Sequence, residues 1–427
     1  MGRGALFLAR GQRRLASRRV VRGMLSGYPR AFWVLFAGTF VNRLGLVVLP
    51  FLTLYLTGER GASIEQATLV VSLYGAGAFA AGPIGGALSD RFGRRAVLIG
   101  SLVGGAALMA GMPLVQGYWP LAGLVLAFGL VGEMYRPAVS AAVSDLVPPE
   151  RFARAFSLLY WAINLGVAFG PALGGVLAER VGYTALFAVD AASMVIYAVA
   201  IFFGVPETKP LAEEAGGAED EATLEAAPRA RGLADALRDP ALLGLAIATL
   251  GVGIAFMQAF ATLPLAMEAD GLSERLYGFA VMVNGLVVVA FSLPVARWAE
   301  TRLGPGLLAS AVATIGVGVG MHALADSFWG HAAAVAVWSL GEIAFIPLVP
   351  AIVARLAPEA LRGTYQGVQQ SGWGLSKMLG PALGGLILAQ LGDAALWGSG
   401  LALALVVAAV ILALRLGAPN PDRVGAG

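Results

Sequence analysis

Long apolar stretches, separated by short polar or Gly/Pro-containing breaks, recur along most of the chain. Each stretch has about 20 residues or more, which is the length that a helix needs to cross a hydrocarbon core of about 30 Å. A transmembrane barrel would instead need segments of about ten residues that alternate in polarity, and this pattern does not occur. We therefore predict an all-α membrane protein with twelve transmembrane helices, over residues 31–56, 66–88, 97–116, 120–145, 155–177, 185–205, 241–267, 278–298, 306–324, 331–353, 365–388 and 395–416.

The composition supports this reading. Of the 427 residues, 58% are hydrophobic and only 13% are charged, and the mean hydropathy is +0.78. So few polar residues cannot cover the surface of a water-soluble domain of this size. We therefore expect the lipid bilayer to surround the protein.

Several kinds of chemistry have no support in the sequence. The chain has no cysteine, which excludes disulfides and thiolate metal sites. It has no phosphate-binding loop and no nucleophile–base motif, so that we expect neither an enzyme nor a bound cofactor or metal. His322 and His331 fall near predicted helix ends, where we expect wetted interfacial side chains rather than ligands.

Basic residues are unequally distributed between the predicted loops, and their bias sets the orientation of a membrane protein. Both termini are predicted to be cytoplasmic, in the cell (inner) membrane. The net charge of +3 then reflects contacts with the inner leaflet, and we expect no nucleic-acid partner. The predicted cytoplasmic side carries the eight arginines of residues 1–30, Arg91, Arg94, Arg95, Arg151, Arg154, Lys209, Arg229, Arg231, Arg238, Arg297, Arg302, Arg355, Arg362, Arg415 and Arg423, against Arg60, Arg180 and Arg275 on the other side.

The polar segments divide the chain into two halves. Residues 1–30 are predicted to form an Arg-rich cytoplasmic tail and residues 417–427 a C-terminal tail. Residues 206–240 are rich in acids and carry few bulky side chains, which is typical of a flexible linker. This linker separates six spans in residues 31–205 from six in residues 241–416. We expect the protein to be a monomer.

The sequence GPALGG occurs twice, and its two prolines are 381 − 171 = 210 positions apart. Gly132-Glu133 and Gly341-Glu342 match at nearly the same offset, which indicates a duplicated unit and hence two pseudo-symmetric six-helix bundles. Parallel duplication of this kind is a transporter architecture with its binding site at mid-depth between the halves. Because glycine and proline allow close packing and bending, we predict a hinge at each copy, with ordinary helix packing as the alternative. The hinge residues are Gly166, Gly170, Pro171, Gly174 and Gly175, and Gly380, Pro381, Gly384 and Gly385.

The segment GGALSDRFGRR, between the second and third predicted helices, resembles the signature loop of the major facilitator superfamily. The resemblance covers residues 31–416 and implies that family's fold and alternating access. In the family, an acid at the position of Asp90 bonds across to the other half and helps to hold the inner gate shut, and Asp145 resembles the acid that partners the arginines of the loop. The matching loop positions are Gly86, Asp90, Arg91, Gly93, Arg94 and Arg95.

The segment GVAFGPALGG is similar to the fifth-helix motif of drug:proton antiporters, which favours export. This sequence departs from that motif at one position, because Ser157 stands where a glycine is expected nine positions before Gly166. The motif can also persist in relatives that move solutes inward. Uptake therefore stays open as an alternative.

Six ionisable residues are predicted at membrane depth, where each costs roughly 2.5–3.5 kcal/mol unless it is paired or wetted. Helical spacing places Glu133 and Arg136 on one polar stripe, and Lys377 on another with Gln366, Gln370 and Trp373. The family resemblance implies that these stripes face a central cavity. Asp190 is expected to be an interfacial or capping residue. The six are Arg43, Glu133, Arg136, Asp190, Glu342 and Lys377.

Glu342 is the first candidate for the group that couples transport to protons, because no cation lies one helical turn away. Glu133 is the second candidate, with a purely structural ion pair to Arg136 as the alternative. Three cations against two acids make the predicted cavity positive, which favours neutral, zwitterionic or anionic amphipathic solutes. Further wall residues would be Tyr74, Tyr160, Trp161, Asn164, Met257, Gln258, Asn284, Trp338, Phe345, Gln370 and Trp373.

Three functions follow as hypotheses. The first is a proton-coupled, multidrug-type exporter of small amphipathic molecules. The second is a proton-coupled symporter for a zwitterionic or anionic solute such as a peptide, an amino acid or an organic acid. The third, a non-transporting receptor or a lipid-handling relative, would need a large soluble domain or a lateral opening, and the sequence offers no such domain.

Overall fold

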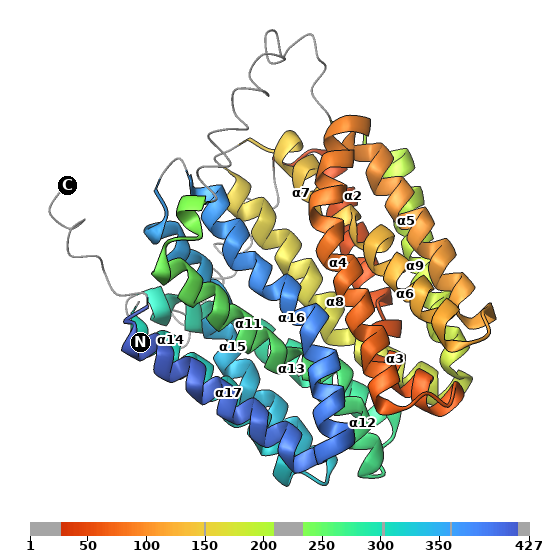
Figure 1. The fold of residues 1–427 in the computed structure, drawn as a ribbon. Coiled ribbons are helices and arrows are strands. Elements are labelled where there is room, and N and C mark those ends of the chain that lie inside the picture. Colours follow the sequence, from red (N-terminus) through yellow and green to blue (C-terminus); the bar gives the residue numbers. More distant parts are fainter. Residues whose placement is uncertain (1–26, 149–150, 209–233, 301–303, 359–360, 417–427) are drawn as a thin grey trace, which may run out of the picture.

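The computed structural model describes residues 27–148, 151–208, 234–300, 304–358 and 361–416. Within these ranges the chain is helical and contains no strand. Figure 1 shows two bundles of long helices side by side, one coloured red to yellow-green and the other green to blue. The all-α membrane fold predicted from the hydropathy pattern is confirmed. Most of the predicted N-terminal tail, most of the predicted linker and the predicted C-terminal tail lie outside the described residues.

The helices overlap all twelve predicted spans. In the first half they are α2 (Arg30–Gly45), α3 (Val48–Leu54) with η1 (Tyr55–Glu59), α4 (Ile64–Phe92), α5 (Arg94–Gly111) with η2 (Met112–Leu114), α6 (Tyr118–Glu133), α7 (Tyr135–Leu146), α8 (Phe152–Val181) and α9 (Tyr183–Gly204). In the second half they are α11 (Pro240–Ala261), α12 (Leu263–Ala269), α13 (Glu274–Glu300), α14 (Pro305–Met321) with η4 (His322–Leu324), α15 (Phe328–Leu356), α16 (Arg362–Leu391) and α17 (Asp393–Ala413).

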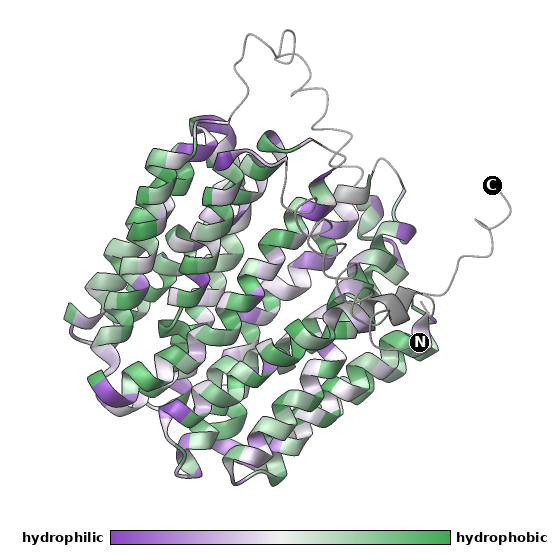
Figure 2. Ribbon diagram, turned by 180° about the vertical axis from the view of Figure 1, so that it is seen from behind, coloured by the Kyte–Doolittle hydropathy of each residue, from purple (hydrophilic) through white to green (hydrophobic). Residues whose placement is uncertain are grey.

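Eleven helical segments in the described part of the chain are long and apolar enough to cross a membrane. The twelfth, α16, is 30 residues long but more polar, because it carries glutamines, serines and Lys377. It runs beside α4 and α11 along the bundle. Figure 2 shows hydrophobic residues along the helices and hydrophilic ones gathered at the two ends, as a bilayer requires.

The first span of each half is broken at a corresponding place. In the first half, α2 ends at Gly45 and α3 begins at Val48. In the second half, the break at Thr262 separates α11 from α12, whose second residue, Pro264, has no N–H to donate. A break inside a bundle leaves backbone groups without helical partners. Other side chains must therefore satisfy them.

Asp190 provides such a partner. Of the two expectations for this residue, interfacial or capping, the interfacial one is wrong and the capping one agrees with the structure. Its side chain is fully buried, at 0% exposure, and Oδ2 accepts a hydrogen bond of 3.4 Å from the backbone N–H of Val48. The carboxylate therefore caps the first turn of α3 inside the protein. The break in the first span leaves backbone N–H groups that need an acceptor inside the protein. The position of Asp190 along its own predicted helix does not reveal this need.

The expectation that the two histidines are wetted is also wrong. His322 and His331 are 2% and 1% exposed. Each ring bonds the other, and His331 also bonds Asp270. Burial is tolerated because these hydrogen bonds replace those to water.

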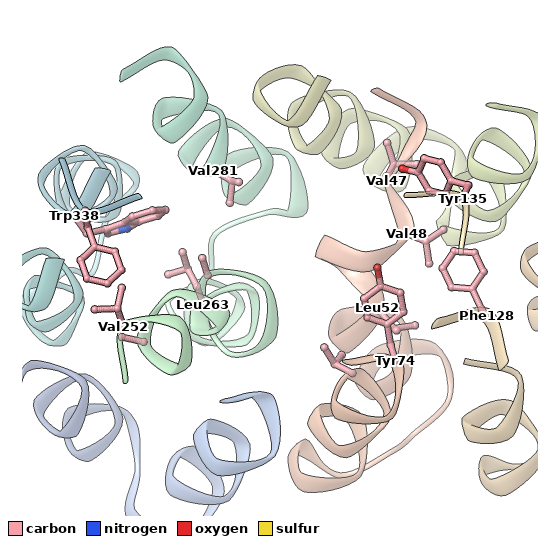
Figure 3. Close-up of a cluster of buried hydrophobic side chains, with 14 of the residues drawn as sticks. Val47, Val48, Leu52, Tyr74, Phe128, Tyr135, Val252, Leu263, Val281 and Trp338 are labelled. Carbon is pink, nitrogen blue, oxygen red and sulfur yellow. The ribbon is translucent and has the colours of Figure 1, made fainter. Parts of the chain in front are cut away.

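The buried hydrophobic side chains form one continuous core that extends through both halves. In Figure 3, Val47, Val48, Leu52, Tyr74, Phe128 and Tyr135 gather on one side, and Val252, Leu263, Val281 and Trp338 on the other. The halves meet chiefly through α4 against α16 and α8 against α13.

Hydrogen bonds and an ion pair connect the two halves toward the end of the molecule at which α3 and α12 are found. We call this the far end (bottom of Figure 1). There Ser72 Oγ accepts a 2.8 Å hydrogen bond from Ala382 N, and Tyr183 donates a 3.0 Å bond to Glu274. Arg275 and Glu179 form an ion pair of 3.3 Å. We call the opposite end, where α4 ends at Phe92 and α5 begins at Arg94, the arginine-loop end. The halves are thus joined at the far end.

Candidate functional site

A break between α6 and α7 positions the acid of the first half. Pro137 has no N–H, so that the carbonyl of Glu133, four residues earlier, loses its helical hydrogen bond. The helix is interrupted there, at Met134. Ser101 of α5 bridges the break, because its Oγ donates to Val131 O at 2.6 Å and accepts from Tyr135 N at 3.0 Å. Glu133, the last residue of α6, reaches Tyr74 of α4 from this break.

Glu133 is the centre of a charged cluster in the first half. It forms an ion pair with Arg136 and accepts a 2.9 Å hydrogen bond from the Tyr74 hydroxyl. Arg43 of α2 donates a 2.5 Å bond to the Tyr135 hydroxyl. The Glu133 side chain is 7% exposed, whereas that of Arg136 is 40% exposed. The cluster is therefore buried at the acid and open at Arg136.

Lys377 brings a third cation to this cluster from the second half. The backbone of α16 at Lys377 lies against Gly75 of α4, where a side chain at Gly75 would collide with the Lys377 carbonyl. The ammonium interacts electrostatically with Arg43, Glu133 and Arg136. Three cations thus face one acid, which gives this cluster a net positive charge.

Two donors in the cluster have no acceptor in the part of the chain that the structure describes. The Arg43 Nε atom is buried and has no hydrogen-bond partner there. Lys377 has no ion-pair partner within 4 Å among the described residues. Because buried donors in folded proteins are almost always paired, the cluster is suited to receive an anionic or hydrogen-bond-accepting group.

Glu342 lies apart from these cations. Its Oε2 atom accepts a 2.6 Å hydrogen bond from Asn284 Nδ2 of α13, which also donates to Ser339 Oγ at 2.9 Å. Among the described residues Glu342 forms no ion pair. Its charge acts on Tyr160 of α8, which is in the first half. The charged residues that we expected around one cavity therefore form two groups, a cationic cluster and the separate Glu342 carboxyl.

Aromatic side chains lie beside the carboxyl in the second half. Phe256 of α11 packs edge-on against Trp338 at 5.4 Å and against Trp373 at 6.0 Å between ring centroids. Trp338 is buried, and Trp373 is half-buried. These rings, with Glu342 one helical turn beyond Trp338, form an apolar wall of the kind found in small-molecule sites.

Three predicted wall residues make other contacts. Asn164 donates to the Tyr160 carbonyl in its own helix at 2.8 Å. Gln258 is buried and joins α11 to α16, because its Nε2 donates to the Gly380 carbonyl at 2.9 Å. Gln370 is exposed, and no contact connects it with the charged cluster. Sequence spacing alone does not separate such packing roles from a binding role.

The signature loop is organised within the first half. Arg94 pairs with Asp90 at 3.0 Å and with Asp145 at 3.1 Å, and Gly93 has a φ of +96°, which favours glycine. Arg95 donates to the Phe202 carbonyl. Among the described residues Asp90 pairs only with Arg94, and its side chain is 73% exposed. Gly86 and Arg91 lie on α4 beside it.

The two GPALGG copies occupy equivalent positions in the two halves. Gly166 and Gly170 lie against the backbone of α2 at Arg43 and Leu44, and Gly174 lies against Val47 and Phe51, directly beside the break. Pro171 and Gly175 contact α13.

In the second half the corresponding contacts are repeated. Gly380 lies against Met257 and Gly384 against Gln258, one turn before the break at Thr262, while Gly385 contacts Thr68 of α4. Pro381 lies within α16 between them. Each copy therefore packs the broken first span of its own half and, with its last glycine, touches the other half.

Sequence reasoning missed some members of the site. Tyr135 and Ser339 hold Arg43 and Asn284, yet nothing in their local sequence distinguishes them from ordinary helix residues. Pro137 was the available signal for Tyr135, because a proline four residues after an acid at membrane depth predicts a break there.

Two helical halves with equivalent broken spans, and with charged side chains at membrane depth, have the duplicated six-helix architecture of a class of membrane transporters. The sequence pattern described as the Major Facilitator Superfamily matches residues 35–341 and 270–426. The chain belongs to this superfamily. Its relatives and similar structures are transporters, and so is this protein rather than an enzyme.

Three relatives cover most of the chain. The uncharacterized MFS-type transporter YttB of Bacillus subtilis (strain 168) is 30% identical over 394 residues, 90% of this chain and 95% of that protein. A Na(+), Li(+), K(+)/H(+) antiporter of Planococcus maritimus is 25% identical, covering 80% of this chain and 85% of that protein. The multidrug resistance protein MdtH of Klebsiella pneumoniae (strain 342) is 24% identical, covering 79% and 81%.

Solved structures share the fold. A POT family transporter in complex with a thioalcohol conjugated peptide superposes with a TM-score of 0.75 at 16% identity, covering 91% of this chain and 97% of that one. The peptide transporter POT in complex with sulfate has a TM-score of 0.72 at 20% identity, covering 92% and 96%. At this identity the likeness concerns the fold alone.

Proposed function

We propose that the protein is a proton-coupled exporter of small amphipathic molecules that works by alternating access. The observation that carries the proposal is the different bonding of Glu342 and Glu133, the two acids considered for proton coupling. Glu342 is held by the neutral amide of Asn284, whereas Glu133 is paired with Arg136. Protonation of Glu342 leaves no cation unpaired, whereas protonation of Glu133 would strand Arg136 in a buried cluster, which is costly. Glu342 is therefore the coupling acid.

Export is favoured by the fifth-helix motif and by the activities that the relatives carry in their names. One relative is named as a cation/proton antiporter and another as a multidrug resistance protein. The first name states antiport with protons, and the second states resistance to several drugs. The aromatic wall of Phe256, Trp338 and Trp373 suits the apolar part of such a substrate.

The arginine-loop end faces the cytoplasm in this proposal, because the basic residues of the chain gather there. The structure is then an inward-facing state, closed at the far end by the contacts of α4 with α16 and of α8 with α13. Asp90 would exchange its exposed position for a contact with the second half when that end closes. The chain acts as a monomer in the cell membrane, with both termini cytoplasmic.

Proton-coupled uptake of a zwitterionic or anionic solute is the second candidate. The unpaired Arg43 Nε atom and the unpaired Lys377 ammonium favour it, since a carboxylate or phosphonate would satisfy both. Such a solute would bind the charged cluster with its anionic end.

Purified protein in liposomes distinguishes the candidates. Solutes of the cationic, neutral, zwitterionic and anionic classes are tested with pH gradients of either sign. The proposal expects a proton gradient to drive an amphipathic substrate in the direction opposite to proton flow. Movement in the same direction as the protons would identify the symporter, and flux indifferent to both gradients would contradict proton coupling.

A further inference from the structure

The only two histidines of the chain contact each other inside the second half, at the far end. His322 in η4 and His331 in α15 are almost completely buried. Their Nδ1 atoms are 2.9 Å apart, and the ring centroids lie 5.2 Å apart. Nε2 of His331 lies 2.9 Å from Oδ2 of Asp270, the residue after α12. Three titratable groups thus form one continuous hydrogen-bonded chain.

This hydrogen-bonded series of side chains connects the far end of the protein with its interior. At one terminus the Asp270 side chain is 30% exposed. At the other, His322 lines a small internal cavity together with Gln258, Phe256 and Trp338. The Nε2 atom of His322 forms no hydrogen bond with any described residue. The cavity reaches Trp338, which precedes Glu342 by one helical turn on α15.

The hydrogen bonds fix the arrangement of protons in the neutral pair. An ionised Asp270 can only accept, so that Nε2 of His331 must donate to it. Nδ1 of His331 is then unprotonated, and it must accept from the Nδ1–H of His322. This leaves the Nε2 lone pair of His322 directed away from the pair and free to take a proton. All N–H bonds then point toward Asp270.

The charged surroundings of the pair are acidic. The helices α11 and α14 contribute no charged side chain. Glu268 is the charged residue of α12, and Asp270 follows that helix. α17 contributes Asp393, which interacts with both Asp270 and His331. Asp393 is held by Trp397 Nε1 at 2.6 Å, and the Trp397 ring packs on His322 at 4.8 Å. The described residues contain no cluster suited to a metal ion. An added positive charge on the imidazoles is thus compensated by carboxylates.

We infer that His322 and His331 form a second proton-binding site, which passes protons between Asp270 at the far end and the cavity beside Trp338. In one direction a hydronium ion in the cavity protonates His322 Nε2, the Nδ1 proton of His322 moves to His331 Nδ1, and the Nε2 proton of His331 moves to the Asp270 carboxylate. Asp270 then releases it to water. Each step breaks one bond to hydrogen and forms another, and the pair is left with its N–H bonds reversed, ready for passage in the other direction.

The geometry limits the pair to one added proton. With one extra proton, His331 carries hydrogen on both nitrogens, and His322, now protonated at Nε2, changes from donor to acceptor at Nδ1. Both hydrogen bonds therefore remain. A second extra proton would place hydrogen on both facing Nδ1 atoms and two positive charges in stacked rings. The pair therefore binds and releases a single proton at a time.

A spectroscopic test needs no substrate. Because the chain has only two histidines, ¹⁵N-histidine labelling reports just these rings. We expect a scalar coupling between the two Nδ1 atoms through their shared hydrogen, retained after uptake of one proton and lost in His331→Gln. Two rings without such a coupling, or coupling that disappears when the first proton is taken up, would overturn the inference.

A transport test addresses conduction and rests on the proposed proton coupling. In liposomes, His322→Phe keeps a ring against Trp397 but removes both nitrogens. We expect pH-gradient-driven flux to fall by about tenfold or more, while exchange of substrate for substrate is unchanged. Asp326→Asn is the matched control, since it removes an exposed acid at the same end that touches neither histidine.

The two proposals fail in different ways. If the wild-type protein shows no response to a pH gradient, the proposed proton coupling is refuted, and the spectroscopic test alone decides on the proton site. If the wild-type protein is gradient-driven and His322→Phe retains full gradient-driven flux, the relay is refuted and the proposed function stands. Equal loss of driven flux and of exchange would assign His322 a structural role instead.

Discussion

A methyl group at Gly175 should shift the protein toward a conformation that is open at the far end. Gly175 of α8 lies directly against the backbone of α13, so that a Cβ atom there would overlap the Glu274 carbonyl oxygen and meet Arg275 Cα. Both atoms belong to the other half of the molecule. Neither is the end of a flexible side chain, and the helices must therefore separate.

The magnitude follows from the kind of contact. Overpacking a close-packed contact costs typically about 1–3 kcal/mol. This cost applies only while α8 and α13 are in contact, whereas the helix propensity gained by replacing glycine with alanine, about 1 kcal/mol, applies in every conformation. The difference between the conformations thus changes by about 1–3 kcal/mol, or about 5- to 150-fold in their ratio.

Spin labels can measure this shift because the chain has no cysteine. Cysteines introduced at the exposed residues Ala87 of α4 and Ala354 of α15 place one label on each half at the arginine-loop end. In Gly175→Ala we expect the population with the shorter distance to grow. Gly367→Ala is the control, since a Cβ placed there meets no described atom within 4 Å outside the neighbouring backbone of its own helix. An unchanged distance distribution in Gly175→Ala, or an equal change in the control, would refute the reasoning.

Three further predictions concern the charged cluster, the loop and the hinge. Glu133→Gln keeps an acceptor for the Tyr74 hydroxyl but leaves Arg136 unpaired. Because Arg136 is partly exposed, we expect the free energy of unfolding to fall by about 3 kcal/mol or less, measured from the thermal unfolding temperature in detergent, and an unchanged temperature would show that the ion pair is dispensable. Asp90→Asn should impair transport and enrich the inward-facing state in spin-label distances while folding is retained, and an unchanged distribution would remove Asp90 from the gate. Gly170→Leu, whose side chain would meet the α2 backbone, should slow transport strongly in liposomes, and a native rate would reduce the motif to a tolerance for small residues.

The fold was predictable because it is set by hydropathy along the chain. Twelve apolar stretches correspond to twelve helical spans, and only α16, with its polar stripe, is ambiguous by composition. The repeat of GPALGG also predicted equivalent packing in the two halves, since glycines permit the close approach that the structure contains at Gly174 and Gly384. These features depend on local sequence.

The predictions that were wrong concern contacts between helices that are distant in the sequence. Asp190 and the histidine pair are buried because a helix break and a partner 61 residues away supply hydrogen bonds, and spacing within one helix does not reveal either. The same holds for Glu342, whose partner Asn284 belongs to a different helix. The residue types of the site were thus predictable, whereas their division into two groups was not.

The central claim, that Glu342 couples substrate movement to protons, is tested most directly by Glu342→Gln in liposomes. Glutamine keeps the size of the side chain and an oxygen that can accept from Asn284, but it does not titrate. We expect substrate exchange to continue near the wild-type rate while accumulation driven by a pH gradient is lost. Full gradient-driven accumulation by Glu342→Gln would contradict the account, and the same result for Glu133→Gln would leave a facilitator without proton coupling.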